Sequence, residues 1–88
     1  MIRKKVVIQN KLGLHARPSS LLIKLAQNFR SEFKIVKDDM EVNGKSIMGV
    51  MMLGAPCGTE LELIADGVDE EYMIEEIVNL FESKFDEE

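Results

Sequence analysis

The sequence predicts an α+β fold, an open-faced two-layer β-sandwich in which a four-stranded antiparallel sheet carries three helices on one face. Two observations predict it. Apolar and polar residues alternate, as in a sheet with one wet face, over four segments: 2–8, 33–37, 40–42 and 60–65. Three other segments follow helix-starting residues and place apolar side chains at helical spacing. In chain order the elements are βαββαβα.

The first third of the chain predicts a strand, a loop and a helix. The strand at 2–8 alternates except at Val7, and a loop containing Gly13 follows it. Pro18 falls in the first turn of the next helix, where a missing N–H and a fixed φ cost nothing. We therefore expect the N-cap at His15 or Ala16. The apolar stripe of this helix comprises Leu21, Leu22, Leu25, Ala26 and Phe29.

The middle of the chain predicts a hairpin and a short helix. Asp38–Asp39 favours a tight turn between the second and third strands. Asn43–Gly44 is expected to end the third strand, since both residues tolerate φ > 0. Ser46 is a natural N-cap for the apolar helix at 47–53.

The last third predicts a loop, a strand and the final helix. The loop at 54–59 is rich in Gly and Pro, and the fourth strand follows it. Asp69 is expected to cap the last helix. The apolar stripe of that helix comprises Ile74, Ile77, Val78, Phe81 and Phe85.

Composition and charge exclude several classes of protein. A chain of 88 residues is expected to form one domain, spanning 1–88. The net charge of −5 argues against nucleic-acid binding. No apolar run approaches the roughly 18–20 residues of a membrane span, and the apolar stretch after Lys5 is too short for a signal peptide. Cys57 is the only cysteine and cannot form an internal disulfide. We expect a cytoplasmic monomer.

Charge is unevenly spread along the chain. Acidic residues crowd the C-terminal third, which is simplest to interpret as a solvated helix face. Basic residues gather in the first third and favour a locally positive face toward an acidic partner or a phosphate: Arg3, Lys4, Lys5, Lys11, Arg17 and Lys24.

His15 is the only histidine and the candidate for chemistry near neutral pH. It lies between a Gly-containing loop and the start of a helix, with Arg17 two residues further on. A helix N-terminus attracts anions through its backbone N–H groups and its partial positive charge, and a guanidinium holds phosphate oxygens in two-pronged fashion. A neutral ring nitrogen held there is able to attack phosphorus. On these residues alone, an incidental surface histidine remains the alternative.

Two blocks of the sequence resemble one family. Residues 10–18, NKLGLHARP, resemble the active-site loop of HPr, the histidine-containing phosphocarrier of the bacterial phosphoenolpyruvate–sugar phosphotransferase system. Residues 42–51, VNGKSIMGVM, resemble the regulatory segment of the same family. The spacing between the blocks matches as well, and the resemblance covers nearly the whole chain.

The resemblance implies a covalent phosphoryl carrier in sugar transport rather than an enzyme with its own small-molecule substrate. His15 would take a phosphoryl group on Nδ1 from phosphorylated enzyme I and pass it to a histidine of a sugar-specific enzyme II A domain. Arg17 would steady the phosphate, and the backbone N–H groups of Ala16 and Arg17 would line it. The resemblance implies no metal and no cofactor.

The resemblance also gives Ser46 a regulatory role beside helix capping. In relatives the matching serine is phosphorylated with ATP by an HPr kinase/phosphorylase, which slows phosphorylation of the histidine. In several bacteria the phosphoserine form binds a catabolite-control transcription regulator. A phosphate at a helix N-terminus gains donors and a favourable dipole, so both roles are physically compatible.

An apolar surface beside Ser46 is expected to contact partners. The short helix is apolar nearly all round and cannot bury every side chain, and flexible Met side chains adapt to several partners. The resemblance implies partner contacts at Ile47, Met48 and Met51. We expect Ser20 and Lys24 on the preceding helix to extend this surface.

Two departures and three alternatives accompany the resemblance. Pro56–Cys57 is unusual in its loop, and Cys57 is interpreted as an incidental thiol. Ser19–Ser20 stands where the family has small apolar residues, a mild change. A regulatory paralogue acting through protein binding is disfavoured by His15 with Arg17, and a nitrogen-branch carrier by the Ser46 segment. A plain interaction module with no covalent step is the third alternative.

Overall fold

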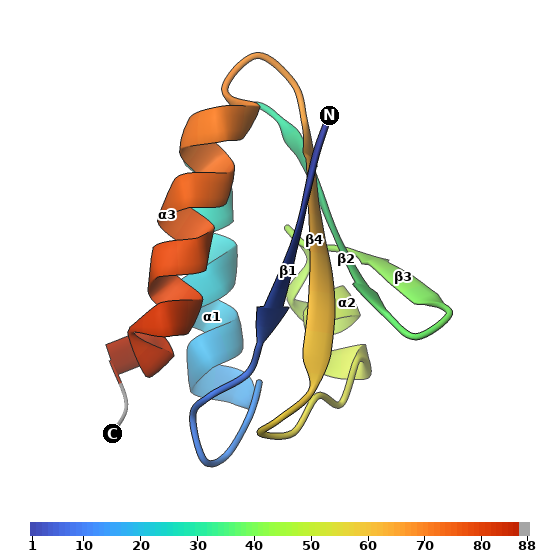
Figure 1. The fold of residues 1–88 in the computed structure, drawn as a ribbon, viewed down its shortest axis with the longest axis vertical. Helices are drawn as coiled ribbons and strands as arrows, with labels where there is room; N and C mark the ends of the chain where they lie inside the picture. Colours follow the sequence, from blue (N-terminus) through green and yellow to red (C-terminus); the bar gives the residue numbers. More distant parts are fainter. Residues whose placement is uncertain (87–88) are drawn as a thin grey trace.

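The computed structural model describes residues 1–86 and confirms the predicted order of elements (Figure 1). The elements are β1 (Ile2–Val7), α1 (Ala16–Ala26), β2 (Glu32–Lys37), β3 (Met40–Asn43), α2 (Ile47–Met52), β4 (Glu60–Asp66) and α3 (Glu70–Glu82), with a short 3₁₀ turn at Lys84–Asp86.

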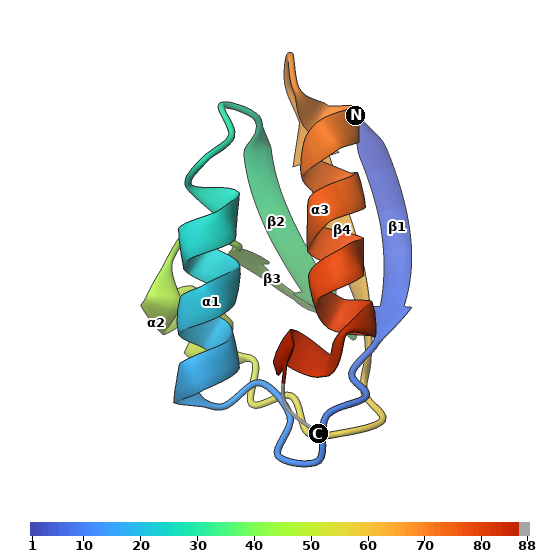
Figure 2. The same cartoon turned by 90° about the vertical axis from the view of Figure 1, so that its left-hand side faces the viewer.

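The four strands form one antiparallel sheet in the order β1-β4-β2-β3. Leu63 of β4 lies opposite Lys4 of β1 on one side and Ile35 of β2 on the other, so β4 and β2 are central and β1 and β3 are edges. Figure 2 shows α1 and α3 side by side over one face of the sheet, running in opposite directions. The predicted two-layer arrangement is therefore confirmed.

The core lies between this face and the helices. Alternate residues of β2 and β4 are buried, as the period-2 pattern predicts, and Ile64 of β4 is buried as well. The helix stripes differ in detail: Ile23 of α1 is buried, whereas Leu21 and Leu25 are only half-buried. Phe29 lies beyond the end of α1, and its carbonyl accepts a hydrogen bond from Lys45 Nζ at 2.7 Å. The helical side of the core comprises Leu22, Ile23, Ala26, Met73, Ile74, Ile77 and Phe81.

Gly44 ends β3 for a different reason from the one predicted. Neither Asn43 nor Gly44 has a positive φ, whereas Asp38 in the hairpin turn does, at 53°. A Cβ at Gly44 would collide with the ring of Phe33, which is only 2% exposed. The Gly44 N–H also donates to the Phe33 carbonyl at 2.8 Å. Close packing, and not backbone conformation, therefore requires glycine here.

Asp69 occupies the N-cap position of α3, but its side chain does not cap the helix, so that prediction was wrong. The carboxylate instead accepts hydrogen bonds from the backbone N–H groups of Arg30 and Ser31, both at 2.9 Å, and from the Ser31 hydroxyl at 2.5 Å. It thus ties the start of α3 to the α1–β2 loop. The bond from the Ser31 hydroxyl, followed by that from Arg30, lowers the pKa of Asp69 from 3.8 to about 2.

The last helix ends earlier than predicted, at Glu82, and Phe85 does not continue its stripe as a helical residue. Lys84, Phe85 and Asp86 have φ values of 58°, 56° and 60°. Left-handed backbone costs an L-residue roughly 1–2 kcal/mol. The Phe85 ring is nevertheless buried and packs edge-on against Phe81, with ring centroids 4.9 Å apart. Burial of this ring offsets the strain of the turn.

The Asp69 cross-link makes a prediction for acid unfolding. The lowered pKa means that the carboxylate stabilises the folded state above about pH 4 and that this stabilisation is lost as the pH falls toward 2. Asp69→Asn should therefore lower the melting temperature at neutral pH and flatten its pH dependence between about pH 4 and pH 2. Circular dichroism melts across this range measure both effects.

Asp39→Asn, in the exposed hairpin turn, is the matched control and should follow the wild-type curve. An Asp69→Asn curve parallel to the wild type throughout the acid range would contradict the assignment.

Candidate functional site

Three segments that are far apart in the sequence meet at one end of the molecule. They are the β1–α1 loop, the α2–β4 loop and the turn at Lys84–Asp86, all at the lower end of Figure 2. The Ile8 N–H donates to the Thr59 carbonyl and the Leu14 N–H to the Ala55 carbonyl, both at 2.9 Å. The two loops are therefore joined by backbone hydrogen bonds at both ends of the segment that leads to His15.

Gly13 lies where the backbones of these two loops come close together. Its φ of +70° lies in the left-handed region, which glycine adopts without steric cost. A Cβ at this position would collide with the Ala55 carbonyl and lie 2.7 Å from Pro56 Cα. Both neighbours are backbone atoms and cannot move aside alone. Because Gly13 has no side chain, the α2–β4 loop can pack directly against the β1–α1 loop.

Two buried polar side chains hold the β1–α1 loop from within. Asn10 is wholly buried, and its Nδ2 donates to the Gly13 carbonyl at 2.7 Å. Ser19 is also wholly buried, and its hydroxyl donates to the Leu14 carbonyl at 3.2 Å. Sequence reasoning missed both roles. The available signal at Asn10 was its place at the start of an Asn-x-x-Gly turn. At Ser19 the signal was a polar residue where the family has small apolar ones, which we interpreted as a mild change.

His15 is the N-cap residue of α1, as predicted, and is half-buried. Its backbone is extended, with φ −81° and ψ −169°, and its side chain does not cap the helix. Ala16 and Arg17 follow in the first turn and are exposed. That turn contains no acidic residue, so the partial positive charge at the start of α1 lies beside the imidazole with no carboxylate within the turn to neutralise it. The arrangement suits an anion bound at His15.

Arg17 connects the start of α1 to the C-terminal turn. Its Nη1 donates to the carbonyl of Phe85 at 3.4 Å. The left-handed turn after α3 aims this carbonyl toward the site, so the strained backbone there helps to place the guanidinium. The structure thus brings together the predicted residues His15, Ala16 and Arg17 in one turn, next to a contact that the sequence did not reveal.

Ser46 is the N-cap of α2, as predicted. The backbone N–H of Gly49 donates to Ser46 Oγ at 3.2 Å, and Ser46 is half-buried. Of the helix that follows, Val50 is buried, together with Leu53 just after it. The opposite face is open to solvent and forms what we call the α2 patch: Ile47, Met48, Met51 and Met52, with exposed fractions of 42%, 73%, 43% and 67%.

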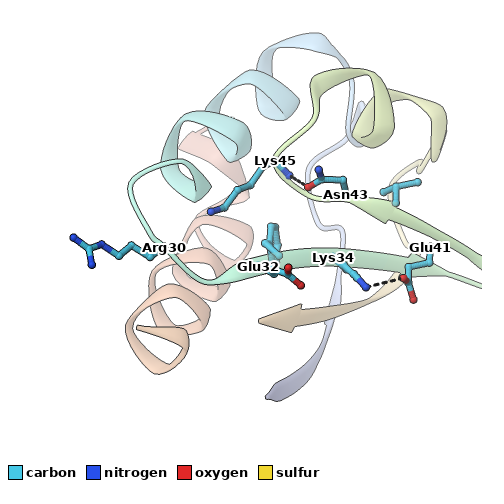
Figure 3. A pocket seen from close by; sticks show the side chains of 8 residues that line it. Arg30, Glu32, Lys34, Glu41, Asn43 and Lys45 are labelled. Carbon is cyan, nitrogen blue, oxygen red and sulfur yellow. Dashed lines mark hydrogen bonds and ion pairs between the residues drawn. The ribbon is translucent and has the colours of Figure 1, made fainter. Parts of the chain in front are cut away.

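The hollow shown in Figure 3 lies away from His15. It has a volume of about 420 Å³ and lies between the α1–β2 loop and strands β2 and β3. Lys34 Nζ is 3.3 Å from Glu41 Oε2, and Lys45 Nζ is bonded to the Phe29 carbonyl, so these two cations are already engaged. The guanidinium of Arg30 points away from the hollow (Figure 3). The lining of this hollow includes neither His15 nor Arg17.

The fold and the site define a class of small α+β proteins in which a lone histidine begins the first helix. The family described as "PTS HPr component phosphorylation site" matches residues 2–83. The chain belongs to this HPr family and is a phosphocarrier protein of the phosphotransferase system, not itself a catalyst.

Individual relatives agree over the full length. The phosphocarrier protein HPr of Treponema pallidum is 47% identical over 88 residues, which covers 100% of both chains. The crystal structure of HPr-C-His from Thermoanaerobacter tengcongensis superposes with a TM-score of 0.97 at 48% identity, covering 100% of this chain and 99% of the other. The HPr-like protein Crh of Bacillus subtilis is 44% identical over 77 residues, covering 88% of this chain and 91% of Crh.

The contact of Gly13 with the α2–β4 loop predicts that two glycines with positive φ differ in how much stability they lose on substitution by alanine. Gly54→Ala, at φ +55° with no atom within 4 Å of its Cβ, should lose only the roughly 1–2 kcal/mol that a left-handed alanine costs. Gly13→Ala must also displace the Ala55–Pro56 backbone, so it should lose more stability than Gly54→Ala and disturb the His15 loop. Urea unfolding measures both.

Amide spectra should show shifts at His15 in Gly13→Ala but not in Gly54→Ala. Equal costs for the two variants would mean that the Gly13 contact contributes nothing beyond backbone conformation.

Proposed function

We propose that His15 is the residue on which this phosphocarrier holds its phosphoryl group, receiving it from phosphorylated enzyme I and passing it to enzyme II A domains. The observation that carries the proposal is the position of the only histidine, half-buried at the N-cap of a helix whose first turn has no carboxylate. Membership of the family supports the two partners.

The neutral Nδ1 of His15 attacks phosphorus in line, the bond from phosphorus to the donor group of enzyme I breaks, and that group keeps the released electron pair. In the second transfer His15 is the leaving group and a histidine of the enzyme II A domain is the nucleophile. Because both bonds are of the same type, the group can move on with little change in free energy.

The surroundings of His15 stabilise the charge of the phosphoryl group. The N–H groups of Ala16 and Arg17 lie at the positive end of α1, and Pro18 contributes no donor of its own. Arg17 is exposed, and its guanidinium can rotate toward a phosphate oxygen from the Phe85 carbonyl, which it holds at 3.4 Å. Preorganised donors of this kind cost little reorganisation when charge arrives.

We assign the α2 patch, with Ser20 and Lys24 of α1, to partner docking. These α1 residues are exposed, and α1 packs against α2. Met side chains adapt to different partners, which suits a carrier that must dock on a donor and on several acceptors in turn. Within residues 1–86 no helix is long and apolar enough to cross a membrane. We propose that the carrier works as a monomer in the cytoplasm.

We further propose that Ser46 is a regulatory phosphorylation site for an ATP-dependent HPr kinase/phosphorylase, and that the modified form binds a catabolite-control regulator. Ser46 is half-buried at the start of α2, directly beside the exposed Ile47 and Met48. A phosphate there adds about 1.5–2 negative charges next to the docking surface. Similarity to Crh, the "Catabolite Repression HPr" of Bacillus subtilis, favours this regulatory function.

The proposal for His15 is tested by phosphorylation of the chain. Incubation of the chain with enzyme I and phosphoenolpyruvate should attach one acid-labile phosphate, as a P–N bond requires, and His15→Ala should remove it completely. Mass spectrometry at neutral pH measures the added mass. The melting temperature of the variant shows whether it remains folded.

Cys57→Ser is the matched control because the exposed thiol lies on the neighbouring loop. It should retain full labelling. Absence of label on the wild type would overturn the proposed function, and label retained by His15→Ala would place the carrier site elsewhere.

The proposal for Ser46 is tested in the same way with a different phosphoryl donor. Incubation with ATP and an HPr kinase/phosphorylase should give an acid-stable phosphate that is absent from Ser46→Ala. Because Ser46 Oγ also caps α2, the same variant should lose about 0.5–2 kcal/mol of stability. Ser83→Ala, which removes an exposed hydroxyl at the end of α3, should keep the label. Label that persists in Ser46→Ala would contradict the assignment.

A further inference from the structure

Ser19 contacts the peptide groups on both sides of His15. Its hydroxyl donates to the carbonyl of Leu14 at 3.2 Å, and its backbone N–H donates to the carbonyl of His15 at 3.1 Å. The first acceptor belongs to the peptide that precedes His15 and the second to the peptide that follows it. One residue in the helix thus brackets the residue that begins the helix.

The hydroxyl contact differs from the usual behaviour of serine in a helix. A helical Ser commonly bonds to the carbonyl three or four residues earlier, within the same helix. Here the acceptor lies five residues earlier and outside α1, in the β1–α1 loop. Small apolar residues, expected at this position in the family, have no hydroxyl to make such a bond. The contact is therefore a feature of this chain and not of helix geometry in general.

Leu14 is held from two directions. Its N–H donates to the Ala55 carbonyl at 2.9 Å, and its carbonyl accepts from Ser19. Leu14 is 4% exposed and Ser19 is wholly buried, so water does not compete for either group. The orientation of the Leu14–His15 peptide is thereby fixed, and this orientation sets φ of His15 and the direction in which its imidazole leaves the backbone.

We propose that Ser19 is a positioning residue for phosphoryl transfer, which holds His15 in the orientation needed for in-line attack; this inference rests on the proposed function of His15. Ser19 does not itself accept the phosphoryl group, because its hydroxyl is inaccessible. Its contribution is to keep the reacting nitrogen aligned with the donors of the first turn, and small misalignments of reacting groups are costly in rate.

The test is single-turnover transfer of the phosphoryl group from phosphorylated enzyme I to this chain, which is the acceptor. The reaction is followed by rapid quench over a range of concentrations of the chain. Ser19→Ala removes only one oxygen and should fold. The rate at saturating acceptor should fall roughly 3–10-fold, as expected for the loss of one buried hydrogen bond. The concentration for half-maximal rate should stay unchanged, because the α2 patch and the exposed residues of α1 are untouched. The NMR chemical shifts of the His15 ring should also change.

Ser31→Ala is the matched control. It also removes a buried hydroxyl, but at the opposite end of the molecule, where the hydroxyl bonds to Asp69. Assayed at a temperature at which all variants are folded, it should lose stability without slowing transfer or altering the chemical shifts of the His15 ring. This separates positioning from general destabilisation.

The possible outcomes are distinct. A saturating rate for Ser19→Ala equal to that of the wild type, or an equal slowing in Ser31→Ala, would overturn the positioning role and leave the proposed function standing. A wild-type chain that accepts no phosphoryl group would overturn the proposed function and this inference with it.

Discussion

The contact of Gly13 with the Ala55–Pro56 backbone determines where His15 can lie. A loop that crosses an open protein surface is normally mobile, yet this one carries the only histidine. The α2–β4 loop supplies what a buried core supplies elsewhere: the Ala55 carbonyl accepts the Leu14 N–H, and the backbone beside it leaves no room for a side chain at position 13. The start of α1 is thus fixed by backbone contacts, while its exposed side remains accessible to another protein.

The two long helices distribute charge in opposite ways. α3 begins with Glu70 and Glu71, at the end of the molecule far from His15 (Figures 1 and 2). There the carboxylates interact favourably with the positive end of the helix dipole. Glu70 also accepts hydrogen bonds from the Gly67 N–H and from the N-terminal ammonium group of Met1. α1 begins without a carboxylate. The uneven charge of the sequence therefore has a spatial meaning, because the first turn of α3 contains carboxylates and the first turn of α1 contains none.

Much of the fold was predictable because strand alternation and helix spacing are local signals. The His15 N-cap, the Ser46 cap and the Asp38 turn all follow from residues within a few positions of each other. The errors share a cause, which is that long-range contacts leave no local trace. Asp is a residue type that commonly caps helices, but the hydrogen-bond partners of the Asp69 side chain lie 38 and 39 residues away, in the loop after α1. Gly44 is determined by the Phe33 ring, which no reading of its immediate neighbours includes.

The same distinction separates the two proposed sites, His15 and Ser46. Ser46 acts through local structure: its oxygen caps Gly49, and a phosphate on it would meet the same helix start, so modification would change the charge beside the α2 patch without requiring a new backbone. His15 depends on contacts from three segments, among them Ala55 and Phe85. Its position is therefore sensitive to changes anywhere in that set. A residue positioned by distant segments needs interior anchors close to it, and Ser19, which bonds to the peptides on both sides of His15, is placed to be one.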